Sequence, residues 1–374
     1  MALDADLAKI AGLNGLTFYV NAYQIHGRQM SAFNILNFAT VDSIEAQPGT
    51  RLFELWIEQK FNGIGSIRIG QLAAGNLFFV SNISSSLFIN GTFGWPVIFA
   101  ADLPGDGHGY PLTTPGVSLT SNLNDHLALV TGVYNGDAAG AGFTGQEETK
   151  NPAGINFRLP DPPLLMAEAQ YTYNASPGLA GTLKAGGWYH FGSFQDQHFG
   201  LDDRPLADPL SVGVARTHTG DYGVYGVIDQ MLWHLPGDDP KKGIGAFARL
   251  AFSPPDRNLI NLYADAGIDF MGLWEQRPND KFGLAASFSN VSPDVRQLDV
   301  AEAFLTETDK PVLSLTYELV IELTYQAQIA AGWTIQPDFQ YIVHPGGGEI
   351  DPINPEISRI PNAAVFAIRS QLSF

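Results

Sequence analysis

The feature that most constrains this chain is a regular alternation of short and long connections between β-type segments. In the last segment, one face of alternate residues is apolar except at Ser370, with Ala364, Phe366, Ile368 and Leu372, which is the period of a strand. The predicted short connections are 62–63, 124–125, 175–180, 236–242, 273–279 and 331–332. The predicted long connections are 28–49, 73–115, 135–163, 194–221, 291–311 and 345–361, with 254–257 a short exception. Short turns on one rim and long loops on the other are typical of a transmembrane antiparallel β-barrel.

About fourteen strands can be read directly, and a further pair could hide in 28–49. An even number of strands returns the C-terminus to the short-turn, periplasmic side. Residues 1–14 have apolar side chains at helical spacing and are predicted to be a short periplasmic lead, followed by a single barrel domain at 15–374. The start lacks the basic and apolar regions of a signal peptide, so we expect a mature chain with an added start.

Composition excludes several classes of function. With 38 acidic against 20 basic residues the net charge is −18, which disfavours binding to nucleic acid. The absence of Cys excludes disulfides, thiolate metal sites and a Cys nucleophile. No His-Glu-x-x-His or Gly-x-Ser-x-Gly motif is present, so we expect neither an enzyme nor a cofactor. Whether the acidic loops bind a divalent cation such as calcium stays open.

The hairpin predicted at 51–72 separates apolar from polar side chains. Its first strand alternates Phe53, Leu55 and Ile57 with a second set of residues, Glu54, Trp56 and Glu58. In a soluble sandwich the apolar side would be the core and the charged side would face water. In a membrane barrel the apolar side faces lipid and the charges line the lumen.

The segment 75–115 is predicted to fold inward and to narrow the lumen. It is long for a loop and dense in aromatic residues, which are Phe78, Phe79, Phe88, Phe93, Trp95, Phe99 and Tyr110. Burying such a side chain is worth about 1.5 to 3 kcal/mol, so these rings should leave water, and the inside of a barrel shelters them. We expect Asn90, Thr92 and Asp102 to face the pore. The alternative is that the rings hold the loop against an outer surface or a neighbouring subunit.

Four stretches stand out in order along the chain: 52–61 (LFELWIEQKF), 67–71 (IRIGQ), 88–96 (FINGTFGWP) and 336–342 (QPDFQYI), joined by GVYG at 223–226 and DQMLW at 229–233. They resemble the carbohydrate-selective porins of the OprB family, and they are spread over most of the chain. The resemblance implies a sixteen-stranded β-barrel, two strands more than can be read directly. It also implies passage of sugars across the bacterial outer membrane.

Ten residues are candidates for lining the pore and contacting the substrate: Glu54, Trp56, Glu58, Arg68, Asn90, Trp95, Asp102, Arg249, Asp338 and Arg369. Their charges could hydrogen-bond sugar hydroxyls in passage. They could equally form ion pairs that stiffen the barrel wall. The ring of Trp56 could stack on a pyranose or fill space against a folded-in loop.

We therefore expect an outer-membrane porin for passive diffusion of mono- and oligosaccharides, because nothing in the sequence supplies an energy source. Two alternatives stay open. One is a general diffusion porin that mildly prefers cations, which the acidic excess suggests, and the other is a soluble all-β carbohydrate-binding protein.

The expected partners follow from this interpretation. They are sugars as permeants, outer-membrane lipid and lipopolysaccharide around the wall, and the barrel-assembly machinery, which would recognise the terminal Phe374. Both a monomer and a homotrimer remain compatible with the sequence.

Overall fold

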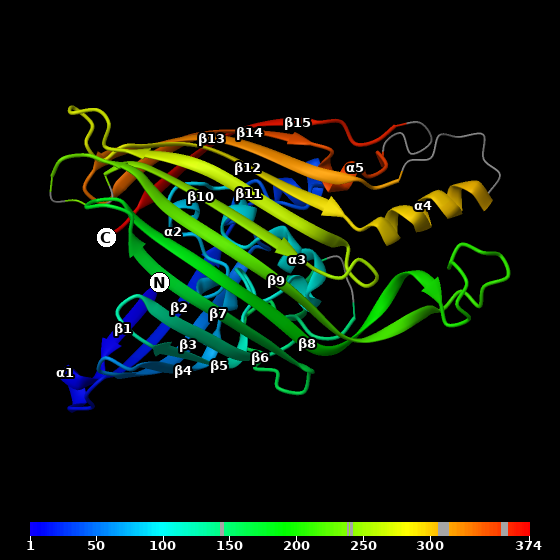
Figure 1. Ribbon diagram of the computed structural model, residues 1–374, viewed down its shortest axis with the longest axis horizontal. Helices are drawn as coiled ribbons and strands as arrows, with labels where there is room; N and C mark the ends of the chain where they lie inside the picture. Colours follow the sequence, from blue (N-terminus) through cyan, green and yellow to red (C-terminus); the bar gives the residue numbers. More distant parts are fainter. Residues whose placement is uncertain (143–145, 238, 240–241, 306–313, 353–357) are drawn as a thin grey trace.

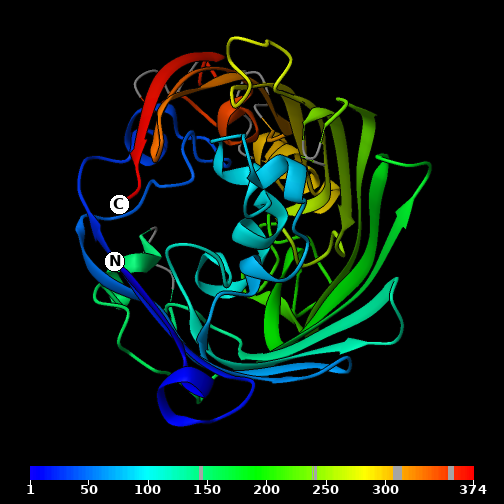
Figure 2. The ribbon, with the colours of Figure 1, turned by 90° about the vertical axis from the view of Figure 1, so that its left-hand side faces the viewer.

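The computed structural model describes residues 1–374 except 143–145, 238, 240–241, 306–313 and 353–357. The described residues form fifteen strands in one antiparallel sheet, in which every strand pairs with its neighbours in sequence. The sheet curls round into a barrel-shaped wall whose edge strands are β1 and β15 (Figures 1 and 2). The predicted all-β antiparallel fold is confirmed, and the described residues form fifteen strands where the family resemblance implied sixteen.

The strands differ mainly in length, and the two longest, β8 and β9, lie side by side in the middle of the sheet. The strands are β1 (Ala2–Asp6), β2 (Leu16–Ile25), β3 (Gly49–Phe61), β4 (Gly65–Leu72), β5 (Thr114–Asn122), β6 (Leu127–Asn135), β7 (Pro163–Asn174), β8 (Ala180–Gly200), β9 (Ala215–His234), β10 (Gly243–Phe252), β11 (Ile260–Met271), β12 (Lys281–Val291), β13 (Tyr317–Ala330), β14 (Trp333–Val343) and β15 (Ala363–Leu372).

The helices are short and lie in the connections. They are α1 (Leu7–Ala11), η1 (Ser31–Ile35), η2 (Ala74–Asn76), α2 (Asn82–Ser85), η3 (Gly91–Phe93), α3 (Val97–Asp102), η4 (Pro104–Asp106), η5 (Glu147–Lys150), α4 (Pro293–Leu305) and α5 (Pro345–Gly348). Among the described residues, none of the helices has the length and apolar character that a membrane-crossing helix needs.

The alternation of short and long connections is present in the structure. The turn between β3 and β4, for example, spans only 62–64, where Gly63 adopts a φ of 73° that a side chain would strain. In Figure 1 the short turns and the C-terminus lie at the left, and α4 and the tip of the β8–β9 hairpin project at the right.

Two predictions about strands were wrong. No further pair of strands occurs in 28–48, because this loop bonds to wall side chains instead of to a neighbouring strand: Glu318 accepts hydrogen bonds from the main-chain N–H groups of Phe38 and Ala39, both at 2.8 Å. The start of the chain is not a separate lead, because Ala2–Asp6 forms β1 and pairs with β2. The helical spacing seen in the sequence holds only from Leu7–Ala11 onward.

The two faces of the wall have the composition of a barrel in lipid. On β15, Phe366 and Ile368 point outward and are 78% and 79% exposed. On β3, Ile57 is outward and exposed, whereas Glu54 and Glu58 on the opposite face are buried. Apolar side chains outside and charged side chains inside are the reverse of a soluble protein and agree with the predicted phase.

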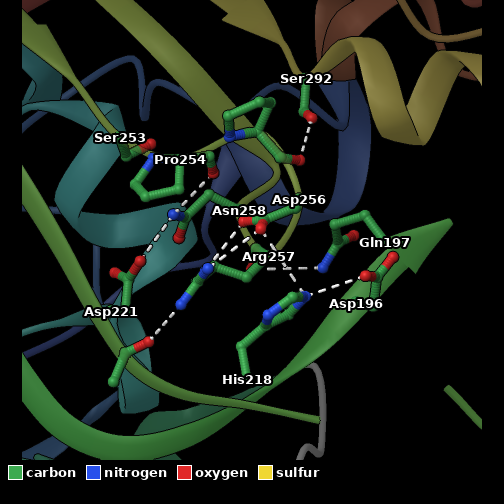
Figure 3. Close-up of polar contacts among 12 residues, drawn as sticks. Asp196, Gln197, His218, Asp221, Ser253, Pro254, Asp256, Arg257, Asn258 and Ser292 are labelled. Carbon is green, nitrogen blue, oxygen red and sulfur yellow. Dashed lines mark hydrogen bonds and ion pairs between the residues drawn. The ribbon is translucent and has the colours of Figure 1, made fainter. Parts of the chain in front are cut away.

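At the end of the barrel that carries the long connections, the short β10–β11 turn forms polar contacts with the β8–β9 hairpin (Figure 3). The Asp256 main-chain oxygen accepts a hydrogen bond from the Gln197 N–H at 2.8 Å, and the Arg257 guanidinium donates to the Gly220 oxygen at 2.8 Å. His218 on β9 contacts the Asp196 carboxylate of β8 at 2.9 Å. The β8 and β9 strands therefore extend well beyond their predicted ends at Ser193 and Tyr222.

The outward-facing, exposed side chains of β15 lead to the first prediction. Because Ile368 faces outward at the middle of the strand, Ile368→Arg should lower the free energy of unfolding by about 2 to 4 kcal/mol in lipid vesicles. Ala367→Arg should cost far less, since Ala367 faces inward and its register partner is Asp338. Urea titrations of both variants provide the comparison, and equal losses would contradict the assigned phase.

Candidate functional site

Residues 73–113, between β4 and β5, fold into the barrel and fill part of its lumen. Figure 2 shows this segment, with α2 and α3, inside the ring of strands. Phe79 packs against rings of the wall, with centroid distances of 4.5 Å to Tyr225 and 6.2 Å to Tyr263. The side chains most deeply buried in this packing are Phe78, Phe79, Phe93, Ile98 and Phe99. Each such burial is worth about 1.5 to 3 kcal/mol, so the loop is held by hydrophobic clusters to which both loop and wall contribute.

Carboxylates of the wall accept hydrogen bonds from the main-chain N–H groups of this loop. The four acceptors come from β3, β7, β9 and β13: Glu54 accepts from Ala73 (3.2 Å), Glu168 from Phe79 (2.8 Å), Asp229 from Asn82 (2.8 Å), and Glu322 from Ile89 and Asn90 (2.7 and 3.0 Å). All four carboxylates are buried. A buried N–H group without an acceptor costs about 1 to 3 kcal/mol, so these contacts fix the path of the loop.

Arg249 makes the corresponding contacts to main-chain oxygens of the loop. It is 2% exposed and donates to the oxygens of Phe79 (3.1 Å) and Thr92 (2.9 Å). Its charge is balanced by Asp265, whose carboxylate lies 2.5 Å away and also accepts from the Tyr263 hydroxyl at 2.7 Å. Side chains of the wall thus bond both to main-chain N–H groups and to main-chain oxygens of the loop.

Seven of the ten residues expected to line the pore are buried, and four of these seven, Glu54, Asn90, Asp102 and Arg249, belong to the contacts between the loop and the wall. Glu54 and Arg249 are occupied by the loop, as described above. Asn90 is fully buried, and its side-chain amide donates to Gln340 at 2.9 Å. Asp102 accepts hydrogen bonds from the Ile260 N–H at 3.0 Å and the Ser253 hydroxyl at 3.2 Å. A folded-in loop needs polar partners, which these residues supply.

Trp56, Arg68 and Glu58 contact one another and the neighbouring strands. The Arg68 guanidinium lies 4.0 Å from the Trp56 ring centroid, and the Tyr19 ring stacks at 4.8 Å. Because β2 and β4 flank β3, these two groups approach the indole from opposite sides. Glu58 accepts from the Ser66 hydroxyl at 2.9 Å and pairs with Arg68 at 3.3 Å. The expected free stacking face of Trp56 is therefore covered.

Trp95 is held inside the loop. Its ring stacks on Phe99 at 4.7 Å, and its indole N–H donates to the Asp106 main-chain oxygen at 3.3 Å. A Cβ added at Gly109 would lie 2.6 Å from the Trp95 Cγ, so this position requires glycine. The indole packs closely on both sides, and only part of it reaches solvent.

The last two expected residues lie on β14 and β15. Asp338 is buried beside Glu322 and accepts from the Gln340 amide at 2.9 Å. Arg369 is partly exposed and pairs with Asp42 of the 26–48 loop at 3.5 Å. It therefore helps to hold a second loop against the wall.

A cavity of about 640 Å³ lies between the 73–113 loop and the loops at 26–48 and 136–162. This volume is within the range of about 300 to 1,000 Å³ that small-molecule sites occupy. Of the ten expected residues, all of which the structure describes, Trp95 alone lines the cavity. Among the described residues, no three His, Asp or Glu side chains are grouped in a way that could hold a metal ion.

Sequence reasoning missed the polar network at the mouth of this cavity. Glu148 accepts hydrogen bonds from the Gln29 amide at 3.2 Å and the Gln47 N–H at 2.6 Å, and the Gln47 amide donates to Gln29 at 3.1 Å. Tyr110 lines the same space and donates to the Ile44 oxygen at 3.1 Å. These residues lie in loops, where no periodicity marks a facing side, so only the acidic Glu147–Glu148 pair could have indicated them.

The Arg249 contacts generate a prediction about loop anchoring. Arg249→Met leaves Asp265 buried without its cation and removes one donor from each of two loop oxygens, so it should lower the free energy of unfolding by about 3 to 5 kcal/mol. Adding Asp265→Leu removes the uncompensated charge and should restore part of this loss. Urea titration of single and double variants measures both, and identical losses would contradict the account.

Comparison with known proteins identifies the family. The model of the carbohydrate-selective porin, OprB family, matches residues 1–374. Porin B of Pseudomonas aeruginosa is 22% identical over 395 aligned residues, covering 100% of this chain and 80% of that protein. The high-pH structure of Pseudomonas putida OprB superposes on this chain with a TM-score of 0.85 at 22% identity, covering 100% of this chain and 86% of that one. The low-pH structure of the same protein superposes with a TM-score of 0.52. The chain belongs to the OprB family of carbohydrate-selective porins.

Proposed function

We propose that this protein is a passive channel through which sugars diffuse across the bacterial outer membrane, and that the 73–113 loop sets the width of the channel. The observation that carries the proposal is the loop itself, anchored across the lumen beside a cavity of about 640 Å³. The cavity lining combines amides, carboxylates and rings. Sugar hydroxyls donate and accept hydrogen bonds, so this lining suits a sugar better than a bare ion.

A general porin that mildly prefers cations is the second candidate. It is favoured by one observation, that Glu45, Asp106, Glu147 and Glu148 line the cavity. A soluble carbohydrate-binding protein is disfavoured by the exposed apolar face of the wall and by the family.

The surroundings of the barrel belong to the same proposal. The outward apolar face would contact membrane lipid and lipopolysaccharide, and Phe374 would be recognised by the barrel-assembly machinery. A monomer and a homotrimer both fit a wall of this kind, and analytical ultracentrifugation in detergent distinguishes them.

Liposome swelling tests the proposed function directly. Proteoliposomes should swell faster in neutral hexoses and disaccharides than in amino acids or salts of equal size, because sugar hydroxyls donate to and accept from the cavity lining without a charge that must be desolvated. Equal rates for all solutes would favour the general porin. No swelling above that of protein-free liposomes would contradict a channel of any kind.

The role of the loop predicts the effect of releasing it. Glu322→Ala removes the acceptor of two buried N–H groups, at about 1 to 3 kcal/mol each, so the loop should loosen and single-channel conductance should rise. Glu58→Gln is the matched control, since Glu58 is also a buried wall carboxylate but contacts Ser66 and Arg68 on the next strand. Planar-bilayer recordings that show the same conductance for both variants would place the constriction elsewhere.

A further inference from the structure

A stack of three side chains stands on the inner face of the wall, in the half of the barrel that carries the short turns. Trp56 of β3 is the middle layer, with the Arg68 guanidinium 4.0 Å from its ring centroid. The Tyr19 ring of β2 is the outer layer, at a centroid distance of 4.8 Å and an interplanar angle of 22°. Tyr19 points into the lumen, because it lies in register with Trp56, whereas Phe18 lies in register with the outward-facing Ile57.

The two inner layers hold the Tyr19 ring in place. Arg68 pairs with Glu58 at 3.3 Å, and Trp56 is buried, so both are fixed against the wall. Tyr19 packs at the edge of the hydrophobic cluster that loop and wall share and stays partly exposed. One face of its ring is therefore supported by Trp56, and solvent in the lumen reaches the rest of the ring.

Two polar side chains stand beside this ring. Asp4 of β1 lies directly opposite Tyr19 in register, which places the two Cβ atoms about 5 Å apart. Thr17 lies two residues from Tyr19 on the same face of β2, at about 7 Å. Within the described part of the chain, neither of these side chains nor the Tyr19 hydroxyl makes a hydrogen bond or an ion pair. Their donors and acceptors are therefore available to a solute.

The stack is separate from the cavity between the loops. Tyr19, Trp56 and Arg68 are absent from the cavity lining. Glu54, which accepts from the Ala73 N–H of the 73–113 loop, lies two residues from Trp56 toward the long-loop end of β3. The stack thus lies on the periplasmic side of this anchor, at the end of the barrel from which Figure 2 is viewed. A solute that has passed the loop meets it before it leaves the channel.

A flat ring bordered by free hydrogen-bonding groups fits a pyranose. The C–H groups on one face of a pyranose can pack on an aromatic ring, while the hydroxyls at its edge donate and accept hydrogen bonds. An acyclic polyol such as sorbitol carries the same kind of hydroxyl groups and has a similar size, but it has no rigid apolar face. The ring of Tyr19 therefore distinguishes these solutes by shape.

We propose that Tyr19 is a binding platform for ring sugars on the periplasmic side of the 73–113 loop, and that it favours the passage of pyranoses over acyclic polyols of similar size. This role rests on the proposed sugar-channel function, to which it adds a second contact site and a preference for the ring form.

The first experiment compares the fluxes of glucose and sorbitol into proteoliposomes at low solute concentration, where a weak site on the path raises flux. Glucose should cross about twofold to tenfold faster than sorbitol, which is the effect of one aromatic contact. Equal fluxes of the two solutes would overturn the role of Tyr19 and leave the sugar channel intact. Failure of both solutes to cross would instead overturn the proposed function.

Substitutions of Tyr19 assign the preference to its ring. Tyr19→Leu keeps an apolar side chain on Trp56 but removes the flat ring, so the ratio of glucose flux to sorbitol flux should fall to about one. Tyr19→Phe keeps the ring and should retain most of the preference. Tyr171→Leu is the matched control, because it removes the same ring from the outward face of β7, where Tyr171 is 45% exposed. A wild-type ratio in Tyr19→Leu, or an equal fall in Tyr171→Leu, would overturn the proposal.

Single-channel recordings give an independent readout. Glucose held on the platform should block the ionic current for short times, and Tyr19→Leu should shorten these blocks about twofold to tenfold. Tyr19→Phe and Tyr171→Leu should leave them nearly unchanged. Blocks of the same length in Tyr19→Leu and the wild type would contradict binding at Tyr19.

Discussion

The structure depends on one constraint, that main-chain polar groups carried into a barrel must find partners there. A loop of some forty residues cannot satisfy its own N–H and C=O groups with helices of three to six residues. The wall supplies what is missing: Glu168 and Glu322 accept from loop N–H groups, and Arg249 donates to loop oxygens. The inner face of the sheet is charged for this reason. Its charges position a loop, and only then does the loop define the space that a solute meets.

Buried acidic residues of this protein either hold a loop in place or lie at the cavity, and sequence patterns cannot distinguish these two positions. Glu54 on the wall and Glu148 in a loop are both buried acidic residues inside the barrel. The first holds Ala73 and Asn76, whereas the second contacts Gln29 and Gln47 at the edge of the cavity. Glu54 thus has a structural role, and we propose that residues of the loops face the permeant.

Sequence reasoning predicted the elements governed by local period. Alternation of apolar and polar residues identified fourteen of the fifteen strands in the described part of the chain and the outward phase of Phe366 and Ile368, because every second side chain must face lipid. The strand at Ala2–Asp6 was not predicted, because its five residues, two of them acidic, show no such alternation. The site was predicted less well. Whether Arg249 faces water or a loop depends on contacts 157 and 170 residues away in the chain, which no local pattern contains.

The anchoring contacts also have a mechanical consequence. The wall residues that grip the 73–113 loop lie on β3, β7, β9, β10 and β13, which stand around most of the sheet. A tube of paired strands resists stretching along its hydrogen bonds but can flatten under sideways pressure from the surrounding bilayer. Here the 73–113 loop crosses the lumen and links opposite sides of the wall through hydrogen bonds. Compression of the membrane would therefore be transmitted into the loop's core of Phe79, Phe93 and Phe99, and the width of the passage would stay nearly constant as the bilayer around it fluctuates.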